Sequence, residues 1–507
     1  MSVRRIAKVF VAKNIGQVVL ILTQLTLPPA FLHAYGVKLY GEWLALSAAI
    51  SYLSTFNYGL QTYATTRMTV HYNRGELTEC RQVQSMGLRV LVSVFILAII
   101  LLLSIFYIPL DSILHISIPL RQAQLTLYIL GCQIMANMLS GFFSGSYMVI
   151  REAHRGTHFT NFTQAAVVVF QLGLIASRAS FAEIAGAQLT LTLLASLVML
   201  LDLWKRAPAI RPSLRYWQTG ALGQILKPSA QYALLYSSNI LVYQIPLLLM
   251  QRLLGPAAVV VFSVTRTIYS MSRRVLNVVT SSLGPEITAT VGQKDWRKLH
   301  RLYDLSERVI LWLIPPITFG SMLATPLLLQ LWLHEGNFYN PLVCLLLGIT
   351  MSIMSIKQHK YQFQFSSNEI RDLSYMTIIA YGATVALTIP MMMKFGLAGY
   401  IATWGISEIV QLFYILNLNA KLLAIHGSLD RRPVYKLLGF VAVSCGVFSW
   451  LIFHVSEFSY AVQAVIAAGV AMLTLVVSYR VFGVGEIRSI LWRKLSSRLS
   501  PFSSRRS

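Results

Sequence analysis

Charged residues are scarce in this chain of 507 residues. They make up 12% of the sequence, about half the share found in ordinary soluble domains, whereas hydrophobic residues make up 56%. The four cysteines form no CxxC pair and no evenly spaced set, so neither a structural zinc site nor a disulfide scaffold is expected. The ten histidines are scattered, and we expect no bound metal and no cofactor. These shortages exclude an ordinary soluble domain and indicate an integral membrane protein.

Motifs of catalysis and nucleotide binding are missing as well. The sequence has no Walker A motif, no GxSxG elbow, no HExxH and no zinc or RNA-recognition module. The loops expected inside cannot hold a nucleotide-binding domain, and the longest loop expected outside covers only residues 111–121. We therefore expect a protein that is not an enzyme and binds no nucleic acid. Its energy would come from an ion gradient, the membrane potential or substrate turnover elsewhere.

Long apolar stretches are what the chain does contain, and each can cross ~30 Å of hydrocarbon as a helix. Fourteen of them lie near residues 15–34, 41–64, 86–110, 122–148, 159–177, 183–203, 228–254, 257–283, 306–332, 341–365, 374–395, 397–420, 437–455 and 460–482. They are too long and too uniformly apolar for the alternating strands of a barrel. The predicted fold class is an all-α polytopic membrane protein with about 14 transmembrane helices.

Basic residues predict the orientation of these spans. Lys and Arg number 42 against 18 Asp and Glu. With the N-terminus inside, only Lys38, Arg121 and Arg178 fall in outside loops. Because positive charge is retained on the cytoplasmic side, we expect both termini in the cytoplasm.

The first six spans and the next six resemble each other at an offset of about 219 residues. Gly36 after the first span corresponds to Gly255 after the seventh, and the loop 73–90 corresponds to 292–309. Six spans is an even number, so the two halves should point the same way and enclose a cavity between them. We divide the chain into a first lobe (1–206), a cytoplasmic linker (207–227), a second lobe (228–420), an extra transmembrane helix pair (421–482) and a basic cytoplasmic tail (483–507).

Prolines also recur in the two halves. Pro28 and Pro29 are expected to interrupt the first span, and Pro246 the seventh at nearly the matching place. Paired interruptions can mark the central site of a transporter. Proline is also simply common in membrane helices, and that alternative stays open.

Arg266 stands in the middle of the eighth span, and Arg273 and Arg274 follow two turns later. A guanidinium does not lose its proton and is costly at bilayer depth unless it faces water or an anion. Arg266 and Arg273 are seven residues apart, so they share one helical face. Arg266 is too deep to reach either surface easily, which predicts an anionic substrate.

Other polar side chains within the spans are candidates for substrate binding or ion coupling. The candidates for substrate binding are Lys357, Lys360, Tyr232, Tyr236, Asn239, Tyr243, Asn57, Gln61 and Gln24. The two lysines, like Arg273 and Arg274, can alternatively reach the inner surface by snorkelling, and tyrosines are common at membrane interfaces. Glu408 is the one carboxylate that we expect clearly within a span, and it is a weak candidate for ion coupling.

The chain resembles the lipid-linked oligosaccharide and polysaccharide (O-antigen type) flippases of the multidrug/oligosaccharidyl-lipid/polysaccharide (MOP) exporter superfamily. The resemblance rests on GQVVLILTQLTLPPAFLHAYGVKLYGEWLAL (16–46), NYGLQTYATTRMTVHYNRGEL (57–77), LGPAAVVVFSVTRTI (254–268) and LGPEITATVGQKDW (283–296). It covers the first twelve spans. It implies two six-helix lobes in a V around a central cavity lined mainly by spans 1, 2, 7 and 8, with a C-terminal helix pair in addition.

The resemblance also implies a function. Such flippases move an anionic polyprenyl-pyrophosphate-linked glycan across the bacterial inner membrane by alternating access, for polysaccharides such as lipopolysaccharide O-antigen. Membrane lipids and other polysaccharide-assembly proteins are the implied partners. The lipid II flippase branch keeps a functional arginine where Arg266 lies, but the first span here lacks that branch's charged residues, which argues against lipid II itself.

Three alternative functions are less well supported. A multidrug exporter of the same superfamily would bind cations through intramembrane carboxylates, which are few here. A membrane glycan polymerase would need a catalytic loop or an acid/His pair within the membrane. A scaffold could dock through the basic segment 492–507, but a tail that binds anionic lipid heads explains that segment equally well.

Overall fold

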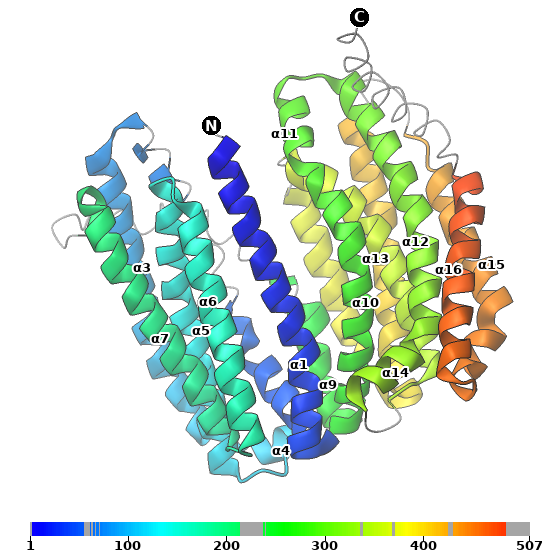
Figure 1. Ribbon diagram of the computed structural model, residues 1–507, viewed down its shortest axis with the longest axis horizontal. Helices are drawn as coiled ribbons and strands as arrows, with labels where there is room; N and C mark the ends of the chain where they lie inside the picture. Colours follow the sequence, from blue (N-terminus) through cyan, green and yellow to red (C-terminus); the bar gives the residue numbers. More distant parts are fainter. Residues whose placement is uncertain are drawn as a thin grey trace, which may run out of the picture. The chain divides into compact units, whose positions relative to one another are not determined.

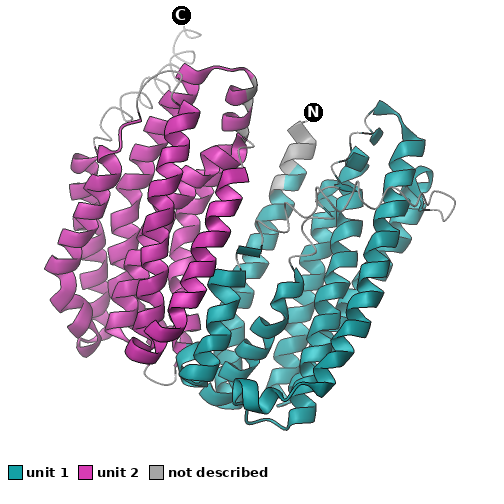
Figure 2. Ribbon diagram, turned by 180° about the vertical axis from the view of Figure 1, so that it is seen from behind, with its two compact units in different colours: residues 1–260 teal, residues 261–507 magenta. Residues whose placement is uncertain are grey.

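The structure is a computed structural model in which every described element is a helix (Figure 1). It describes residues 3–54, 61, 64–65, 67–69, 71–72, 74–212, 237–238, 240–334, 338–367, 371–423 and 429–482. The chain forms two compact units, residues 1–260 and 261–507, which Figure 2 colours separately.

The first unit is built mainly from long helices. Its elements are α1 (Val3–Ile50), η1 (Ser51–Ser54), α3 (Leu77–Leu102), η2 (Leu103–Tyr107), α4 (Leu110–Leu114), α5 (Leu120–Val149), α6 (Ala153–Ala176), α7 (Phe181–Arg206), η3 (Pro208–Ile210), η5 (Ile240–Gln244) and α9 (Ile245–Leu253). Helix α5 packs on α6 and α7, and α1 packs on α6 and α9. Tyr147 at the end of α5 and Arg155 of α6 both donate to the Asp202 carboxylate of α7, which ties these three helices together.

The second unit contains α10 (Pro256–Ser282), apart from its first residues, and all that follows. The other elements are α11 (Gly284–Gly292), α12 (Trp296–Leu333), α13 (Pro341–Ser366), α14 (Arg371–Leu423), α15 (Arg432–His454), η7 (Val455–Glu457) and α16 (Tyr460–Val481). Helix α13 lies in the interior, packed against α12, α14 and α15. The C-terminal pair belongs to this unit, because α16 packs along α12 and α15 contacts α12 and α13.

The lengths and composition of the helices confirm the predicted fold class. Among the described residues, ten helices are long and apolar enough to cross a membrane. Two of them, α1 with 48 residues and α14 with 53, would be roughly 70–80 Å long if straight, more than twice the hydrocarbon thickness. Each therefore contains two crossings. With α10 and the shorter apolar helix Ile240–Leu253, the described helices overlap each of the fourteen predicted spans.

Glycine residues provide the bends that these two double spans require. Gly36 (φ 73°) interrupts α1, and Gly396 (φ 60°) interrupts α14. The chain folds back at both places. The Phe31 ring lies 5.3 Å from the Trp43 ring across the first bend, although twelve residues of straight helix would separate them by roughly 18 Å. A left-handed φ is easily adopted only by glycine, so these two positions fix where the double spans turn.

The prolines behave differently in the two halves. Helix α1 continues through Pro28 and Pro29 and breaks at Gly36 instead, so the prediction that these prolines interrupt the first span is wrong. Membrane helices tolerate proline because neighbouring groups satisfy the freed carbonyls. Pro246 does mark a change of geometry, since the π-helical turn η5 ends directly before α9, which carries this proline in its first turn.

The backbone supports the internal repeat. Three pairs of residues with positive φ lie 219 positions apart: Gly36 and Gly255, Gly75 and Lys294, His115 and His334. Residues other than glycine rarely adopt positive φ, so the shared offset is informative. The turns around the second pair also share their hydrogen bonds, because the Gly75 amide donates to Tyr72 as the Lys294 amide donates to Val291.

The boundary between the two compact units falls at Val260 and Val261. Helix α9 groups with the first unit because it contacts α1 and α4, whereas the repeat places this segment at the start of the second lobe. Most of the predicted linker, from residue 213 onward, lies outside the described residues. The division into lobes at 207–227 stays a prediction.

Candidate functional site

Arg266 lies on α10, which starts with Pro256 directly after the left-handed Gly255. This is the usual place for proline in a helix, because its missing N–H would have no helical partner there. Arg266 is ten residues further along, roughly 15 Å from the helix start. Its guanidinium carbon lies 5.1 Å from the centroid of the Phe262 ring, one turn earlier, and the side chain is half-buried. The ring stabilises the cation by about 0.5–2 kcal/mol without neutralising it.

The described residues around Arg273 offer it only weak acceptors. One of its terminal nitrogens, Nη1, lies 3.5 Å from the Met351 sulfur and 3.4 Å from the Met354 sulfur, both on α13. Its buried Nε has no hydrogen-bond partner within the part of the chain that the structure describes. Thioether sulfur accepts hydrogen bonds poorly, whereas a guanidinium offers five donors. This half-buried cation is therefore suited to bind an anion. Arg274, the next residue, is half-buried as well.

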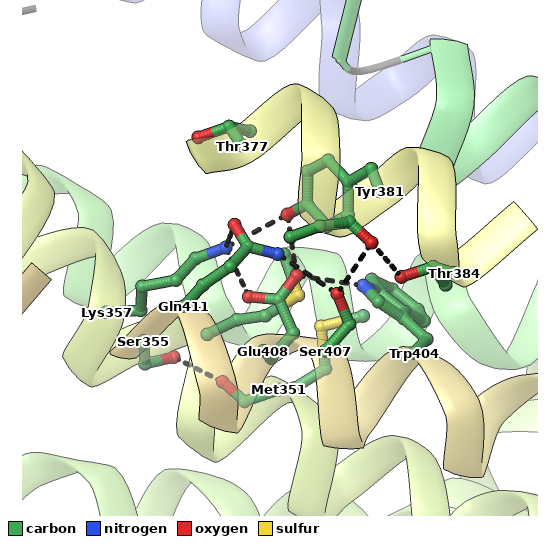
Figure 3. A network of polar contacts seen from close by, with 12 residues as sticks. Met351, Ser355, Lys357, Thr377, Tyr381, Thr384, Trp404, Ser407, Glu408 and Gln411 are labelled. Atoms are coloured by element: carbon green, nitrogen blue, oxygen red, sulfur yellow. Dashed lines mark hydrogen bonds and ion pairs between the residues drawn. The ribbon is translucent and has the colours of Figure 1, made fainter. Parts of the chain in front are cut away.

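A buried ion pair joins α13 to α14 (Figure 3). Lys357 of α13 is 8% exposed, and Glu408 of α14 is fully buried. The Lys357 ammonium pairs with Oε2 of Glu408, and it also donates to the Tyr381 hydroxyl (2.9 Å) and to Oε1 of Gln411 (3.1 Å). The ammonium thus makes one ion pair and two hydrogen bonds. Lys357 is thus fully partnered inside the unit and does not reach its surface.

The Glu408 carboxylate is held by two further donors on its own helix. The Tyr381 hydroxyl and the Trp404 indole N–H donate to Oε1, at 2.6 and 3.0 Å. Tyr381 and Glu408 are 27 residues apart, which would be roughly 40 Å on a straight helix. The bend at Gly396 brings them together, so this network depends on the folding back of α14.

An aromatic column connects Arg266 with this ion pair. The Phe262 ring beneath Arg266 meets the Tyr400 ring edge-on, with the centroids 5.4 Å apart. Tyr400 stacks on Trp404 at 6.0 Å, and Trp404 donates to Glu408. The column is buried throughout. Continuous contacts thus run from Arg266 through three aromatic rings to the carboxylate.

A second buried pair lies one turn further along α13. Lys360 pairs with Glu307 of α12, and its ammonium lies 4.0 Å from the Tyr303 ring centroid. Lys360 is 0% exposed and Glu307 is 3% exposed. The expectation that Glu408 is the one carboxylate clearly within a span is therefore wrong. Glu307 is the second residue of the predicted span 306–332, where a sequence pattern cannot separate a buried from a surface position.

The remaining candidates are spread over the first unit or fall outside the described residues. Tyr243 lies half-buried in η5, and Gln24 is half-buried on α1. Gln61 is half-buried and donates to the Met138 carbonyl (2.8 Å) beside Gly141, where a Cβ atom would collide with the Gln61 side chain. The other four, Asn57, Tyr232, Tyr236 and Asn239, lie outside the described residues. The role of all seven in substrate binding stays a prediction.

Sequence reasoning missed the partners of Glu408. Trp404, Glu408 and Gln411 recur at intervals of four and three, which places them on one face of a helix. This spacing could have indicated a polar face on the twelfth span. Tyr381 carries no comparable signal, because it reaches Glu408 only through the bend in the helix.

No family model and no curated protein sequence matches the chain. Solved structures do match it. The lipid II flippase MurJ in an inward closed conformation aligns with a TM-score of 0.68 and 12% identity, over 97% of this chain and 100% of that one. A multidrug resistance MATE family transporter of the MOP superfamily aligns in its inward-facing conformation with a TM-score of 0.64 and 14% identity, over 82% and 96%. An outward-facing MATE structure aligns with a TM-score of 0.57 and 15% identity, over 83% and 96%.

These likenesses define the class of fold: the chain has the fold of the MOP superfamily transporters. They confirm the predicted resemblance at the level of the fold. The alignment with MurJ leaves 3% of this chain uncovered. The C-terminal helix pair makes up a larger share of the chain than that, so the alignment includes most of it. The structure of MurJ is therefore similar in extent as well as in architecture.

Proposed function

We propose that the protein is a flippase for an anionic, polyprenyl-pyrophosphate-linked oligosaccharide of cell-surface polysaccharide synthesis. The observation that carries the proposal is Arg273, a half-buried guanidinium on a membrane helix. Among the described residues, its hydrogen bonds go only to thioether sulfur. Arg266 lies seven residues away on the same helix, so the two are about 10 Å apart along its axis. Both cations can bind phosphate oxygens in the bidentate manner that guanidinium favours.

The pyrophosphate would enter from the cytoplasmic side, meeting Arg273 and Arg274 before Arg266. Lys357 and Lys360 each pair with a glutamate in the present conformation, so either ammonium would have to leave its glutamate before it could bind the substrate. Transport would proceed by alternating access in the bacterial inner membrane with both termini in the cytoplasm. Membrane lipids and other polysaccharide-assembly proteins would be the partners. The MurJ neighbour, a lipid II flippase, supports the class of lipid-linked substrate.

A multidrug exporter is the second candidate function, and the MATE neighbours favour it. An exporter of cationic drugs needs carboxylates that are free to bind a cation. Glu307 and Glu408, the two buried carboxylates of the second unit's described spans, are each paired with a lysine. Arg273 would in addition repel a cation. The site therefore favours an anionic substrate.

Reconstitution distinguishes the two functions. We expect wild-type protein in proteoliposomes to flip a fluorescent polyprenyl-pyrophosphate oligosaccharide, measured by its accessibility to a membrane-impermeant quencher. We expect no uptake or efflux of the cationic dye ethidium above protein-free vesicles, even with a proton or sodium gradient. Dye transport without glycolipid flipping would replace the proposed function by the multidrug exporter.

A further inference from the structure

The Lys357–Glu408 pair lies close to Arg273. The transport mechanism proposed above gives this pair no role. Lys357 follows Met354 by three residues, so both lie on the same face of α13. The Arg273 guanidinium contacts the Met354 sulfur. The like charges of Arg273 and Lys357 are close enough to interact. Three ionisable groups, Arg273, Lys357 and Glu408, therefore form one cluster at the junction of α10, α13 and α14.

Among the described residues that surround this cluster, no other charged group balances its net charge. From α14, Tyr381 donates to Glu408. On the α12 side, Glu307 is occupied by Lys360. The buried face of α15 is apolar except for Ser444. At the far end of α13, the α11 carboxylate Glu286 pairs with Lys298.

The net charge of the cluster depends on whether Glu408 carries a proton. With Glu408 ionised, two cations face one carboxylate, which leaves a single positive charge. A proton on Glu408 raises this to two. A pyrophosphate that links a lipid to a sugar is a diester and carries two negative charges. A proton on Glu408 therefore adds one positive charge beside Arg273, which strengthens the attraction of the cluster for this dianion.

We propose that Lys357 and Glu408 form a proton switch that controls binding of the pyrophosphate. A proton from the cytoplasm binds Oε2 of Glu408, the atom that the Lys357 ammonium holds at present. The ion pair breaks, and the ammonium turns to the phosphate oxygens beside Arg273. The proton and the anion thus bind together, and release of either one restores the ion pair. This inference rests on the proposed function, since it names the group that couples that same site to protons.

The aromatic column gives the switch a second connection. Trp404 donates to the same carboxylate at Oε1, and it stacks on Tyr400, which meets the Phe262 ring under Arg266. A pyrophosphate that draws Arg266 off Phe262 releases the packing of this column. Substrate binding is therefore linked to Glu408 in two ways, through the aromatic column from Arg266 and through Lys357 from Arg273.

Binding measured against pH tests the switch. The probe is a short-chain polyprenyl-pyrophosphate oligosaccharide. Its diester phosphates stay ionised from about pH 5 to about pH 8, so the charge of the probe does not change in this range. For the purified wild-type protein we expect affinity to rise toward acid. The logarithm of the affinity should fall with pH at a slope approaching −1, as linkage to one proton requires.

Two variants separate the switch from other causes. Glu408→Gln resembles the protonated side chain, so we expect binding that does not depend on pH and stays near the acidic limit of wild type. The charge-neutral double variant Lys357→Met/Glu408→Gln keeps the fold without a broken ion pair, and we expect weaker binding that is also independent of pH. Thermal unfolding shows that each variant is folded.

The outcomes are distinguishable. A folded Glu408→Gln or double variant that keeps the wild-type slope would overturn the switch, because another group would then carry the proton. Wild-type binding at one affinity throughout the pH range would overturn it as well, while leaving the proposed function intact. Failure of the folded wild type to bind the probe at any pH would overturn the proposed function itself.

Discussion

Replacing Arg266 with alanine is expected to reduce glycolipid flipping to about one tenth to one hundredth of the wild-type rate or less. Hydrogen bonds to charged groups contribute about 1.5–3 kcal/mol each, and the Arg266 site is partly removed from water. Arg266→Lys keeps the charge but loses the planar fork, so we expect an intermediate rate. Flipping in proteoliposomes, normalised to the amount of folded protein, is the measurement.

Arg480→Ala is the matched control for this experiment. Arg480 is an exposed arginine in the last turn of α16, so its replacement also removes one positive charge from the second unit. We expect its flipping rate to equal that of wild type. If Arg266→Ala and Arg480→Ala flip equally well, Arg266 takes no part in transport and the anion site must lie elsewhere.

Replacing Glu307 with leucine is expected to destabilise the protein by about 3–5 kcal/mol, because Lys360 would be left buried without its counter-charge. The double variant Glu307→Leu/Lys360→Met removes both charges. It should recover most of that loss, since replacing a buried ion pair by apolar groups is often nearly neutral. Thermal unfolding in detergent measures both variants.

This pair of variants also decides what Lys360 does. A double variant that is stable and flips glycolipid at the wild-type rate would assign Lys360 to the structure of the second unit. A stable double variant with greatly reduced flipping would assign Lys360 to substrate binding, as its position on the tenth span predicts. A single variant as stable as wild type would contradict the ion pair itself.

The fold could be predicted from the sequence because one physical requirement dominates it. Every backbone polar group in hydrocarbon must be bonded within its own helix, so apolar length alone identifies the spans. The connections were harder to predict. Helices α1 and α14 each cover two predicted spans, and the turn lies at a single glycine in each, Gly36 and Gly396. Pro28 and Pro29 were the more conspicuous signal, but the helix continues through them.

The site could be predicted only where it depends on local geometry. Arg266 and Arg273 are on one helix, so their spacing alone indicates a shared face. The lysines of α13 required knowledge of tertiary structure. Lys357 pairs with a carboxylate on α14, which follows α13 in the chain. Lys360 pairs with a carboxylate on α12, which precedes α13. No periodicity in a single sequence shows that two lysines one turn apart pair with carboxylates on different helices.

Changing the charge of the lipid linkage shows whether the second unit selects an anion. Wild-type protein in proteoliposomes would receive two fluorescent glycolipids with the same glycan and the same polyprenyl chain. One carries the pyrophosphate, and the other is a neutral glycoside without it. We expect flipping of the pyrophosphate-linked glycolipid and none of the neutral one above protein-free vesicles. Equal flipping of both would contradict this expectation, because recognition would then lie in the glycan or the lipid and not in the arginines of α10.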